Sequence, residues 1–231
     1  MKSTLTTTLA LLLANPASRS GYLTPAYPVL FAAGGVALQS VLVKTFWRRA
    51  SVAVLVIGGA VTFPFAVPVL PTGRYVAYAA LAGQKPKTEE KKDVGRLPQF
   101  FADREGWREF VGQVVVAWDR LSPDEKAVAI VLVGNYGEAG AIERLARDHG
   151  IPVISGHNNY WLWGPGPRAA DVVLVVSDSR ERQEARFESV EDAGRIYCGD
   201  FMPYENGLSI FIGRGLRRPL AAMWPDLKHY D

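Results

Sequence analysis

Three clusters in the second half of the chain hold the residue types that could do chemistry. The first is GNYGEAGAI at 134–142, where glycines permit a tight turn and a helix follows. Its glycine spacing differs from the dinucleotide-binding fingerprint, and Glu138 at the helix start would repel a phosphate while interacting favourably with the helix dipole. We therefore take Glu138 as a candidate acid or base, and Asn135 and Tyr136 as candidate ligand contacts.

The second cluster, SGHNNYWLWGPG at 155–166, is rich in aromatic and amide side chains. This composition suits stacking on a sugar or on a lipid head group, but the same aromatic residues could equally pack as a cover over the end of a sheet. A histidine with no cysteine or second histidine near it in the sequence is a poor candidate for a metal ligand. The candidate ligand-binding residues of this cluster are His157, Asn158, Tyr160, Trp161 and Trp163.

The third cluster, MPYENGL at 202–208, contains Glu205 and Asn206, which together with Glu138 complete the candidate ligand-binding residues, although as a turn the cluster needs no function. Glu138 with Glu205 is the one pair of carboxylates that merits a test as acid and base. Cys198 is the only cysteine, so no disulfide can form within the chain, and a core position is its simplest interpretation. We expect no cofactor, with a divalent metal left as an open alternative.

Short, regular elements must position these clusters. Apolar residues recur every three or four positions at 107–121, which indicates an amphipathic helix, and SPDE at 122–125 can cap a further turn. Buried strands are expected at 127–134, 151–155, 171–177 and 208–215, and helices at 138–149 and 180–190. This order predicts an α/β domain at 97–231 with an open, doubly wound and mostly parallel sheet. In such sheets the functional crevice lies beyond the carboxyl ends of the strands, where the clusters fall.

The first third of the chain has a different composition, since residues 1–82 carry six Lys or Arg and no Asp or Glu. The uncharged runs at 25–43 and 50–70 are each long enough to cross most of a hydrocarbon core of about 30 Å. The alternative, two buried helices of a globular protein, is rare in a domain of this size. We therefore expect two transmembrane helices within 25–70, after an N-terminal segment, 1–24, that looks like a weak signal peptide or a truncated span.

The charges between the two runs give an orientation. Lys44, Arg48 and Arg49 form the densest cationic cluster of the first third, so the positive-inside rule places this loop in the cytoplasm. The interfacial segment and charged linker at 71–96 and the α/β domain then lie on the extracytoplasmic side of the plasma membrane. The lipid bilayer is the expected partner. The rest of the chain has 20 Lys and Arg against 23 Asp and Glu, which argues against nucleic acid as a partner.

The three clusters, together with RRPLAAMWPDLKHY at 217–230, resemble the C-terminal region of bacterial family 39 glycosyltransferase-like membrane proteins of the GT-C type. The stretch GYLTPAYPVLFAAGGVAL at 21–38 resembles the same family. It matches the Tyr-x-x-Pro-x-Tyr-Pro pattern that opens a late transmembrane helix in relatives of the dolichyl-phosphate-mannose protein mannosyltransferases. The resemblance covers nearly the whole chain from Gly21 onward.

Members of that family span the membrane many times and transfer a sugar from a polyprenyl-phosphate donor on the extracytoplasmic face. Their catalytic acid lies in the first extracytoplasmic loop, and residues 1–82 hold no carboxylate side chain that could correspond to it. The resemblance therefore implies no catalytic residue here. It implies a C-terminal portion of such a transferase, inactive alone, from a truncated gene, a split protein or a misplaced start codon. A many-span membrane protein carrying the catalytic loop would be its partner, and a polyprenyl-phosphate sugar or glycan its ligand.

Two other functions stay open. One is a membrane-tethered extracytoplasmic module that binds a glycan or a lipid-linked sugar without catalysis. The other is a small hydrolase that uses Glu138 or Glu205, although no nucleophile, base and orienting group occur together in the sequence.

Overall fold

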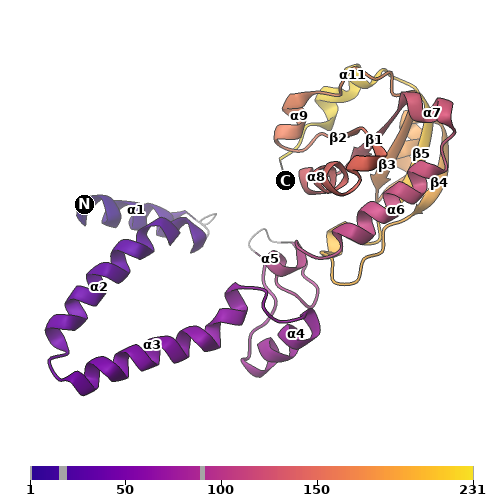
Figure 1. Ribbon diagram of the computed structural model, residues 1–231. Coiled ribbons are helices and arrows are strands. Elements are labelled where there is room, and N and C mark those ends of the chain that lie inside the picture. Colours follow the sequence, from indigo (N-terminus) through magenta and orange to yellow (C-terminus); the bar gives the residue numbers. More distant parts are fainter. Residues whose placement is uncertain (1, 16–19, 89–91, 231) are drawn as a thin grey trace. The chain divides into compact units, whose positions relative to one another are not determined.

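The computed structural model describes residues 2–15, 20–88 and 92–230 (Figure 1). Its contacts divide the chain into two compact units, Met1–Gln84 and Lys85–Asp231. The division falls inside the stretch expected to be an interfacial segment and linker. Thr88 Oγ1 donates to Gln99 Oε1 at 2.7 Å, which ties the residues just after the division to the second unit. Residues 89–91 of the expected linker lie outside the described residues.

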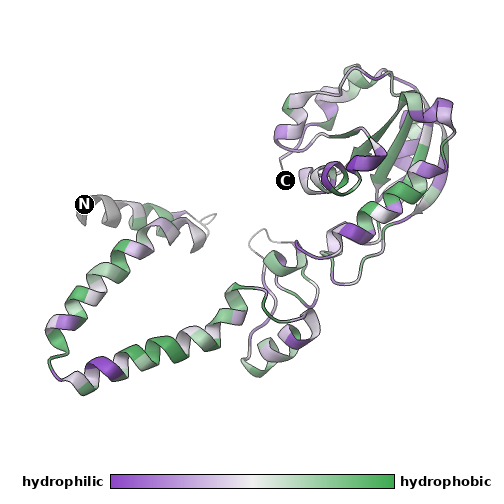
Figure 2. Cartoon of the chain, in the orientation of Figure 1, coloured by the Kyte–Doolittle hydropathy of each residue, from purple (hydrophilic) through white to green (hydrophobic). Residues whose placement is uncertain are grey.

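The first unit consists of helices. They are α1 (Lys2–Ala14), the 3-10 helix η1 (Ser20–Ala26), α2 (Tyr27–Val41), α3 (Thr45–Ala66) and α4 (Thr72–Leu81). Apolar side chains predominate in α2 and α3, and none of the residues of these two helices is buried within the chain (Figure 2). The stretch Gly21–Val41 and helix α3 are both long and apolar enough to cross a membrane. Both uncharged runs are therefore helices with an unburied apolar surface, which marks a site of interaction rather than a core. Residues 16–19, in the small-residue part of the signal-like segment, lie outside the described residues.

The turn between α2 and α3 is shorter than the sequence predicts. The second run is predicted to begin at residue 50 after a cationic loop, but α3 begins at Thr45 and includes Arg48. The Arg48 guanidinium donates to the carbonyl oxygens of Leu42 at 2.6 Å and Gln39 at 3.2 Å, and so caps the end of α2. Helix α3 ends at Ala66 rather than near residue 70, because a residue that precedes a proline, here Pro68, disfavours the helical conformation.

The second unit is built on one five-stranded sheet. Its strands are β1 (Ala129–Val133), β2 (Val153–Ser155), β3 (Val172–Ser177), β4 (Phe187–Arg195) and β5 (Ser209–Leu216). Their order across the sheet is β2-β1-β3-β5-β4. Strand β1 pairs in parallel with β2 and β3, whereas β5 is antiparallel to both β3 and β4. The predicted α/β class is confirmed, but the sheet is mixed, so the doubly wound, mostly parallel arrangement is not.

One strand that the sequence did not reveal accounts for this difference. A helix is predicted at 180–190, but α10 (Arg180–Arg186) ends where Phe187 begins β4. The charged residues of β4 hide its two-residue period, because only Phe187 and Ala193 in it are buried. From β4 the chain turns back into β5, which therefore runs antiparallel to its neighbours.

Helices cover both faces of the sheet (Figure 1). The helices of the second unit are α5 (Gln99–Ala102), α6 (Trp107–Asp119), α7 (Pro123–Val128), α8 (Tyr136–Leu145), η2 (Arg147–His149), α9 (Asn159–Trp163), α10, η3 (Pro203–Glu205), α11 (Leu220–Met223) and η4 (Trp224–Leu227). Side chains alternate along β3: Leu174 belongs to the core cluster that holds Phe110 of α6 and Ile142 of α8. Val173 belongs to the opposite cluster, with Trp224. Because burying each such side chain contributes about 1.5–3 kcal/mol, this alternation fixes the register of the strand.

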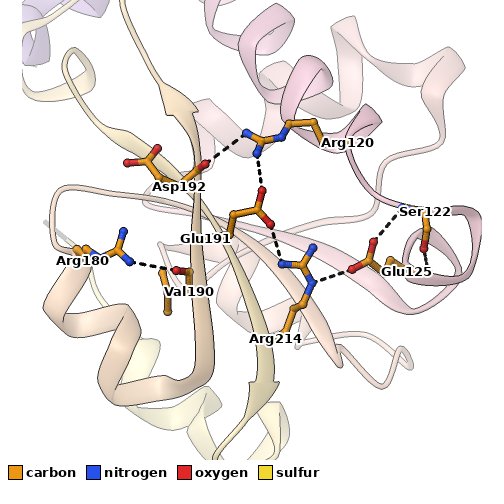
Figure 3. Close-up of polar contacts among 8 residues, drawn as sticks. All are labelled: Arg120, Ser122, Glu125, Arg180, Val190, Glu191, Asp192 and Arg214. Carbon is orange, nitrogen blue, oxygen red and sulfur yellow. Dashed lines mark hydrogen bonds and ion pairs between the residues drawn. The ribbon is translucent and has the colours of Figure 1, made fainter.

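A network of charged residues fastens α6 and α7 to the antiparallel side of the sheet (Figure 3). Arg214 of β5 donates to Glu125 at 2.7 Å and to Glu191 of β4 at 2.9 Å. Arg120, just after α6, pairs with the other oxygen of Glu191. Glu125 and Ser122 form the capping box that the SPDE sequence predicts. Each acidic side chain in this network pairs with a basic one, so the role of the network is to hold these elements of the fold together.

Candidate functional site

Asn135 and Glu138 organise the turn after β1. Asn135 is the N-cap of α8, and its Oδ1 accepts hydrogen bonds from the amides of Gly137 at 2.8 Å and Glu138 at 3.0 Å. Glu138 reaches back, and its Oε2 accepts from the amides of Gly134 at 2.6 Å and Asn135 at 3.2 Å. These bonds form a capping box that satisfies the amides at the start of the helix. Both residues therefore have a local structural role.

The side chain of Glu205, on η3, lies against the same turn. Asn135 Nδ2 donates to Glu205 Oε1 at 2.7 Å and the Asn135 amide donates to Glu138 Oε2 at 3.2 Å, so Asn135 links the two carboxyl groups. Glu138 is 1% exposed and Glu205 is 4% exposed. Within the described residues, Glu205 Oε2 is buried without a hydrogen-bond partner, so a proton shared with the Glu138 carboxyl group would satisfy it.

Burial governs the protonation of this pair. Burial first, and then the charge of Glu205, raise the pKa of Glu138 well above its usual range. Burial also raises the pKa of Glu205, although its hydrogen bonds to Glu138 and Asn135 act in the opposite direction. Two such close carboxyl groups share a proton because they cannot both ionise at low cost. The predicted acid–base pair is thus brought together, but as a buried clamp between α8 and η3 that offers no oxygen to a substrate at the surface.

The ring of His157, just after β2, belongs to an aromatic stack. It lies parallel to the ring of His229, with centroids 4.9 Å apart and an angle of 4°, and its centroid is 5.1 Å from that of Tyr136. His229 Nε2 lies 2.8 Å from the carbonyl oxygen of Gly134, and its Nδ1 lies 2.9 Å from that of Leu227. The stack therefore joins the C-terminal segment to the ends of β1 and β2.

The backbone at Gly156 and Asn158 brings that C-terminal segment close. A Cβ atom at Gly156 would lie 1.9 Å from the carbonyl oxygen of Leu227, so only glycine fits there. The amide of His229 donates to Gly156, and the amide of Asn158 donates to His229, both at 3.1 Å. Asn158 has a φ of 52° with a ψ of −131°, a conformation that is strained for a residue other than glycine, and its Nδ2 lies 3.0 Å from His157 Nε2. This turn starts the short helix α9.

Helix α9 presents Tyr160 and Trp163 to a pocket of about 370 Å³ beside the edge strand β2. The two ring centroids are 4.5 Å apart, and Tyr160 donates to Glu143 of α8 at 2.9 Å. Burial, followed by that carboxylate, raises the pKa of Tyr160 to about 12, so the hydroxyl stays a donor. The lining residues are Ile130, Glu143, Ile151, Pro152, Val153, Ile154, Tyr160, Trp163, Gly164, Pro165, Gly166, Pro167 and Arg168.

Arg168 anchors the proline- and glycine-rich wall of this pocket. Its Nη1 donates to the carbonyl oxygens of Lys126 at 3.2 Å, Ala127 at 3.0 Å and Ala129 at 3.4 Å. These carbonyls belong to the end of α7 and the start of β1, where a cation is favourable. The wall is therefore held to the sheet by a side chain rather than by strand pairing.

Trp161 and Asn206 lie elsewhere and hold the fold together. Trp161 Nε1 donates to the carbonyl oxygen of Trp224, and Trp224 Nε1 donates to that of Trp161, both at 3.0 Å. Lys228 Nζ lies 4.3 Å from the centroid of the Trp161 ring. Asn206 accepts from the Cys198 amide at 3.0 Å and donates to the Cys198 carbonyl at 2.9 Å.

The candidate residues thus separate into three groups. Asn135, Tyr136, Glu138, His157, Asn158 and Glu205 meet at the ends of β1 and β2. Tyr160 and Trp163 line the pocket, while Trp161 and Asn206 are structural.

Sequence reasoning missed three contributors, namely His229, Glu143 and Arg168. The i, i+4 spacing of Glu143 with Ala139 on α8 could have predicted that Glu143 lies beside a buried helix face. No local sequence pattern predicts the positions of His229 and Arg168.

No group of three His, Cys, Asp or Glu side chains that could hold a metal ion occurs in residues 2–15, 20–88 and 92–230. Comparisons with protein-family models, with curated proteins and with solved structures found no match to this chain.

Proposed function

We propose that this chain is the membrane-anchored, sugar-recognising part of a family 39-type glycosyltransferase system that uses a polyprenyl-phosphate-linked donor. The observation that carries the proposal is the pocket beside β2, in which two aromatic rings stand next to a carboxylate. The motif resemblance from Gly21 onward suggests the class of reaction, which is sugar transfer from a polyprenyl-phosphate donor. The pocket suggests the role of this chain in that reaction, which is to recognise the sugar.

The pocket has the chemistry that sugar rings require. Trp163 is 69% exposed. Exposing so large an aromatic group to water is costly unless a ligand covers it. Its face and that of Tyr160 can stack on the C–H faces of a sugar, while Glu143 can accept hydrogen bonds from sugar hydroxyls. The Pro-Gly wall fixed by Arg168 gives the pocket a preformed shape.

The catalytic group is assigned to another polypeptide. The two carboxyl groups that could act as acid and base, Glu138 and Glu205, share a proton and are buried. Residues 1–82 hold no carboxylate side chain to act in a loop of the first unit. A many-span membrane protein with a carboxylate-bearing extracytoplasmic loop would supply the acid, and this chain would hold the glycan or the lipid-linked sugar.

The membrane orientation follows from charge. The stretch Gly21–Val41 and helix α3 would be the two crossings, and the positive charges of Lys44, Arg48 and Arg49 at and just after the turn between them support its location on the cytoplasmic side of the plasma membrane. The second unit then lies on the extracytoplasmic side, where polyprenyl-phosphate sugars are used as donors in this class of reaction.

A transfer assay tests the proposal. Membranes that contain this chain, with or without a candidate many-span partner that has a carboxylate-bearing extracytoplasmic loop, are supplied with polyprenyl-phosphate-linked labelled mannose. We expect transfer only when both proteins are present, and a reduction of about tenfold when Trp163→Ala replaces the wild type. Leu162→Ala is the matched control, because Leu162 is an equally exposed neighbour outside the pocket lining.

Transfer by this chain alone would contradict the assignment of the catalytic acid to a partner. Absence of transfer in every combination, with sugar binding retained, would favour the alternative of a tethered binding module without catalysis.

A further inference from the structure

A second, smaller pocket of about 160 Å³ lies between the end of α10 and the segment α11–η4. Its lining residues are Ala185, Arg186, Arg217, Arg218, Met223, Asp226 and Leu227. Three arginines and one aspartate therefore line this pocket together with three apolar residues. This charge pattern differs from that of the sugar pocket and of the network in Figure 3, in which acids and bases alternate.

Two of the three arginines are held in place by the backbone. Arg217 Nε donates to the carbonyl oxygen of Phe187 at 3.0 Å. Arg218 Nη2 donates to the carbonyl oxygen of Ala222 at 3.0 Å. Because one nitrogen of each guanidinium is fixed in this way, less side-chain entropy is lost when the remaining N–H groups bind a ligand.

Arg186 is the member of the group that the rest of the described chain does not hold by a side-chain hydrogen bond. It is half-buried, and within the described residues its guanidinium donates no hydrogen bond to another residue. Burial first, and then the positive charge of Arg182, lower its pKa, while Asp226 acts in the opposite direction. A positive charge at Arg186 is therefore only partly compensated by the protein.

The neighbouring acids do not neutralise the pocket. Arg218 pairs with Asp226 at 3.3 Å, but the two side chains are mostly exposed, where such pairs contribute little. Asp178 pairs with Arg182 at 3.4 Å, one turn of α10 away from the pocket lining. The balance at the pocket itself remains positive.

We propose that this arginine pocket binds a phosphoryl group. A phosphate presents several acceptor oxygens and up to two negative charges, which matches a pocket lined by three arginines better than the two oxygens of a carboxylate do. The planar fork of Arg186 can bind two of these oxygens at once, and the apolar floor of Ala185, Met223 and Leu227 strengthens the interaction by excluding water. The phosphoryl group could belong to a lipid head group or to a soluble phosphate. The site is independent of the sugar pocket and stands whether or not that pocket binds sugar.

The test is isothermal titration calorimetry of the full chain in maltoside micelles at constant ionic strength, with inorganic phosphate as the probe and acetate as the comparison. We expect phosphate to bind more tightly than acetate, and Arg186→Gln to weaken phosphate binding at least about tenfold. Arg180→Gln is the matched control. Arg180 is on the same helix, but it bonds to Glu184 and to the Val190 carbonyl (Figure 3) and does not line the pocket. Arg186→Lys keeps the charge but loses the planar fork, so its affinity for phosphate should lie between that of the wild type and that of Arg186→Gln. If Arg186→Gln fails to fold, Arg186→Lys takes its place in the test.

The outcomes are distinct. Phosphate binding that is no tighter than acetate binding, or that falls equally in Arg180→Gln and Arg186→Gln, would overturn the proposal. A second titration with dihexanoyl phosphatidic acid identifies the source. Binding more than about tenfold tighter than that of inorganic phosphate, and dependent on Arg186, indicates a lipid head group, whereas equal affinity indicates a soluble phosphate.

Discussion

Asn135 links the buried carboxyl groups of Glu138 and Glu205 in the interior of the second unit, although these two residues lie 67 positions apart in the sequence. One belongs to the capping box of α8 and the other to η3, and Asn135 bonds to both. The contact joins the turn after β1 to the segment that leads into β5. Its strength depends on a proton that the two carboxyl groups share.

The stability of the second unit should therefore depend on pH through this pair. The pKa of each carboxyl is raised above its ordinary value of 4.5, so the folded state binds more protons than the unfolded state above that pH. The contribution of the pair is fully present below pH 4.5 and is lost as the pH rises through the raised pKa values. We expect the free energy of unfolding in urea to fall with pH in this window, by at most about 1.4 kcal/mol per pH unit for each proton.

Glu138→Gln should remove much of this dependence, because a glutamine can accept the two amide bonds and donate to Glu205 at any pH. Glu143→Gln is the control, since Glu143 is exposed and lies outside the pair. The lowered pKa values of Asp119 and Glu125 act at pH values below their ordinary 3.8 and 4.5, outside the window used here. An equal pH dependence in the wild type and Glu138→Gln would contradict the shared proton.

Gly156→Ala should detach the C-terminal segment from the end of β2. The added Cβ would lie 1.9 Å from the Leu227 carbonyl oxygen, which is backbone and cannot move without breaking the His229 contacts. We expect a loss of about 1–3 kcal/mol in the free energy of unfolding. Gly112→Ala, in the exposed interior of α6 with nothing within 4 Å of its Cβ, should instead stabilise by about 0.5–1 kcal/mol. Thermal unfolding followed by circular dichroism measures both, and similar effects of the two substitutions would refute the close approach.

Trp161→Phe should lower the free energy of unfolding without leaving a large cavity. The variant keeps an aromatic ring beneath Lys228 but loses the bond to the Trp224 carbonyl, which we expect to cost about 1 kcal/mol. Trp163→Phe removes the same indole nitrogen at a mostly exposed position and should leave the melting temperature unchanged. If both variants melted like the wild type, the reciprocal tryptophan pair would not contribute to the fold.

The orientation in the membrane can be tested by cysteine labelling because the thiol of Cys198, the only native cysteine, should not react with the label. Cys198 is 1% exposed, and burial first, then the charges of Glu109 and Glu205, raise its pKa to about 11. In intact cells a membrane-impermeant maleimide should label Arg104→Cys, in the second unit, but not Thr45→Cys, at the turn between the two apolar helices. The opposite pattern would reverse the orientation derived from the positive charges.

Local sequence patterns predicted much of the second unit because they reflect local physics. The apolar periods at 107–121 and 171–177 became α6 and β3, and the SPDE capping box formed as expected. Strand β4 could not be predicted because charged residues conceal its half-buried pattern; one of them, Glu191, pairs with Arg120 just after α6 and with Arg214 of β5. Those partners are distant in sequence.

The residues of the candidate site could be predicted from the sequence, but their arrangement in space could not. The meeting of Asn135, Glu138 and His157 follows from the parallel pairing of β1 and β2. That Glu205 would be buried against Glu138, and that Trp161 would face Trp224 while Trp163 faced solvent, depends on tertiary packing that no local pattern encodes.

The most direct test of the central claim is a titration of the full chain in maltoside micelles with a short-chain polyprenyl phosphate that carries mannose. We predict saturable binding that falls about tenfold in Trp163→Ala and changes less than about twofold in Leu162→Ala. Absence of binding by the wild type, or an equal effect of the two substitutions, would contradict a sugar site in the pocket beside β2.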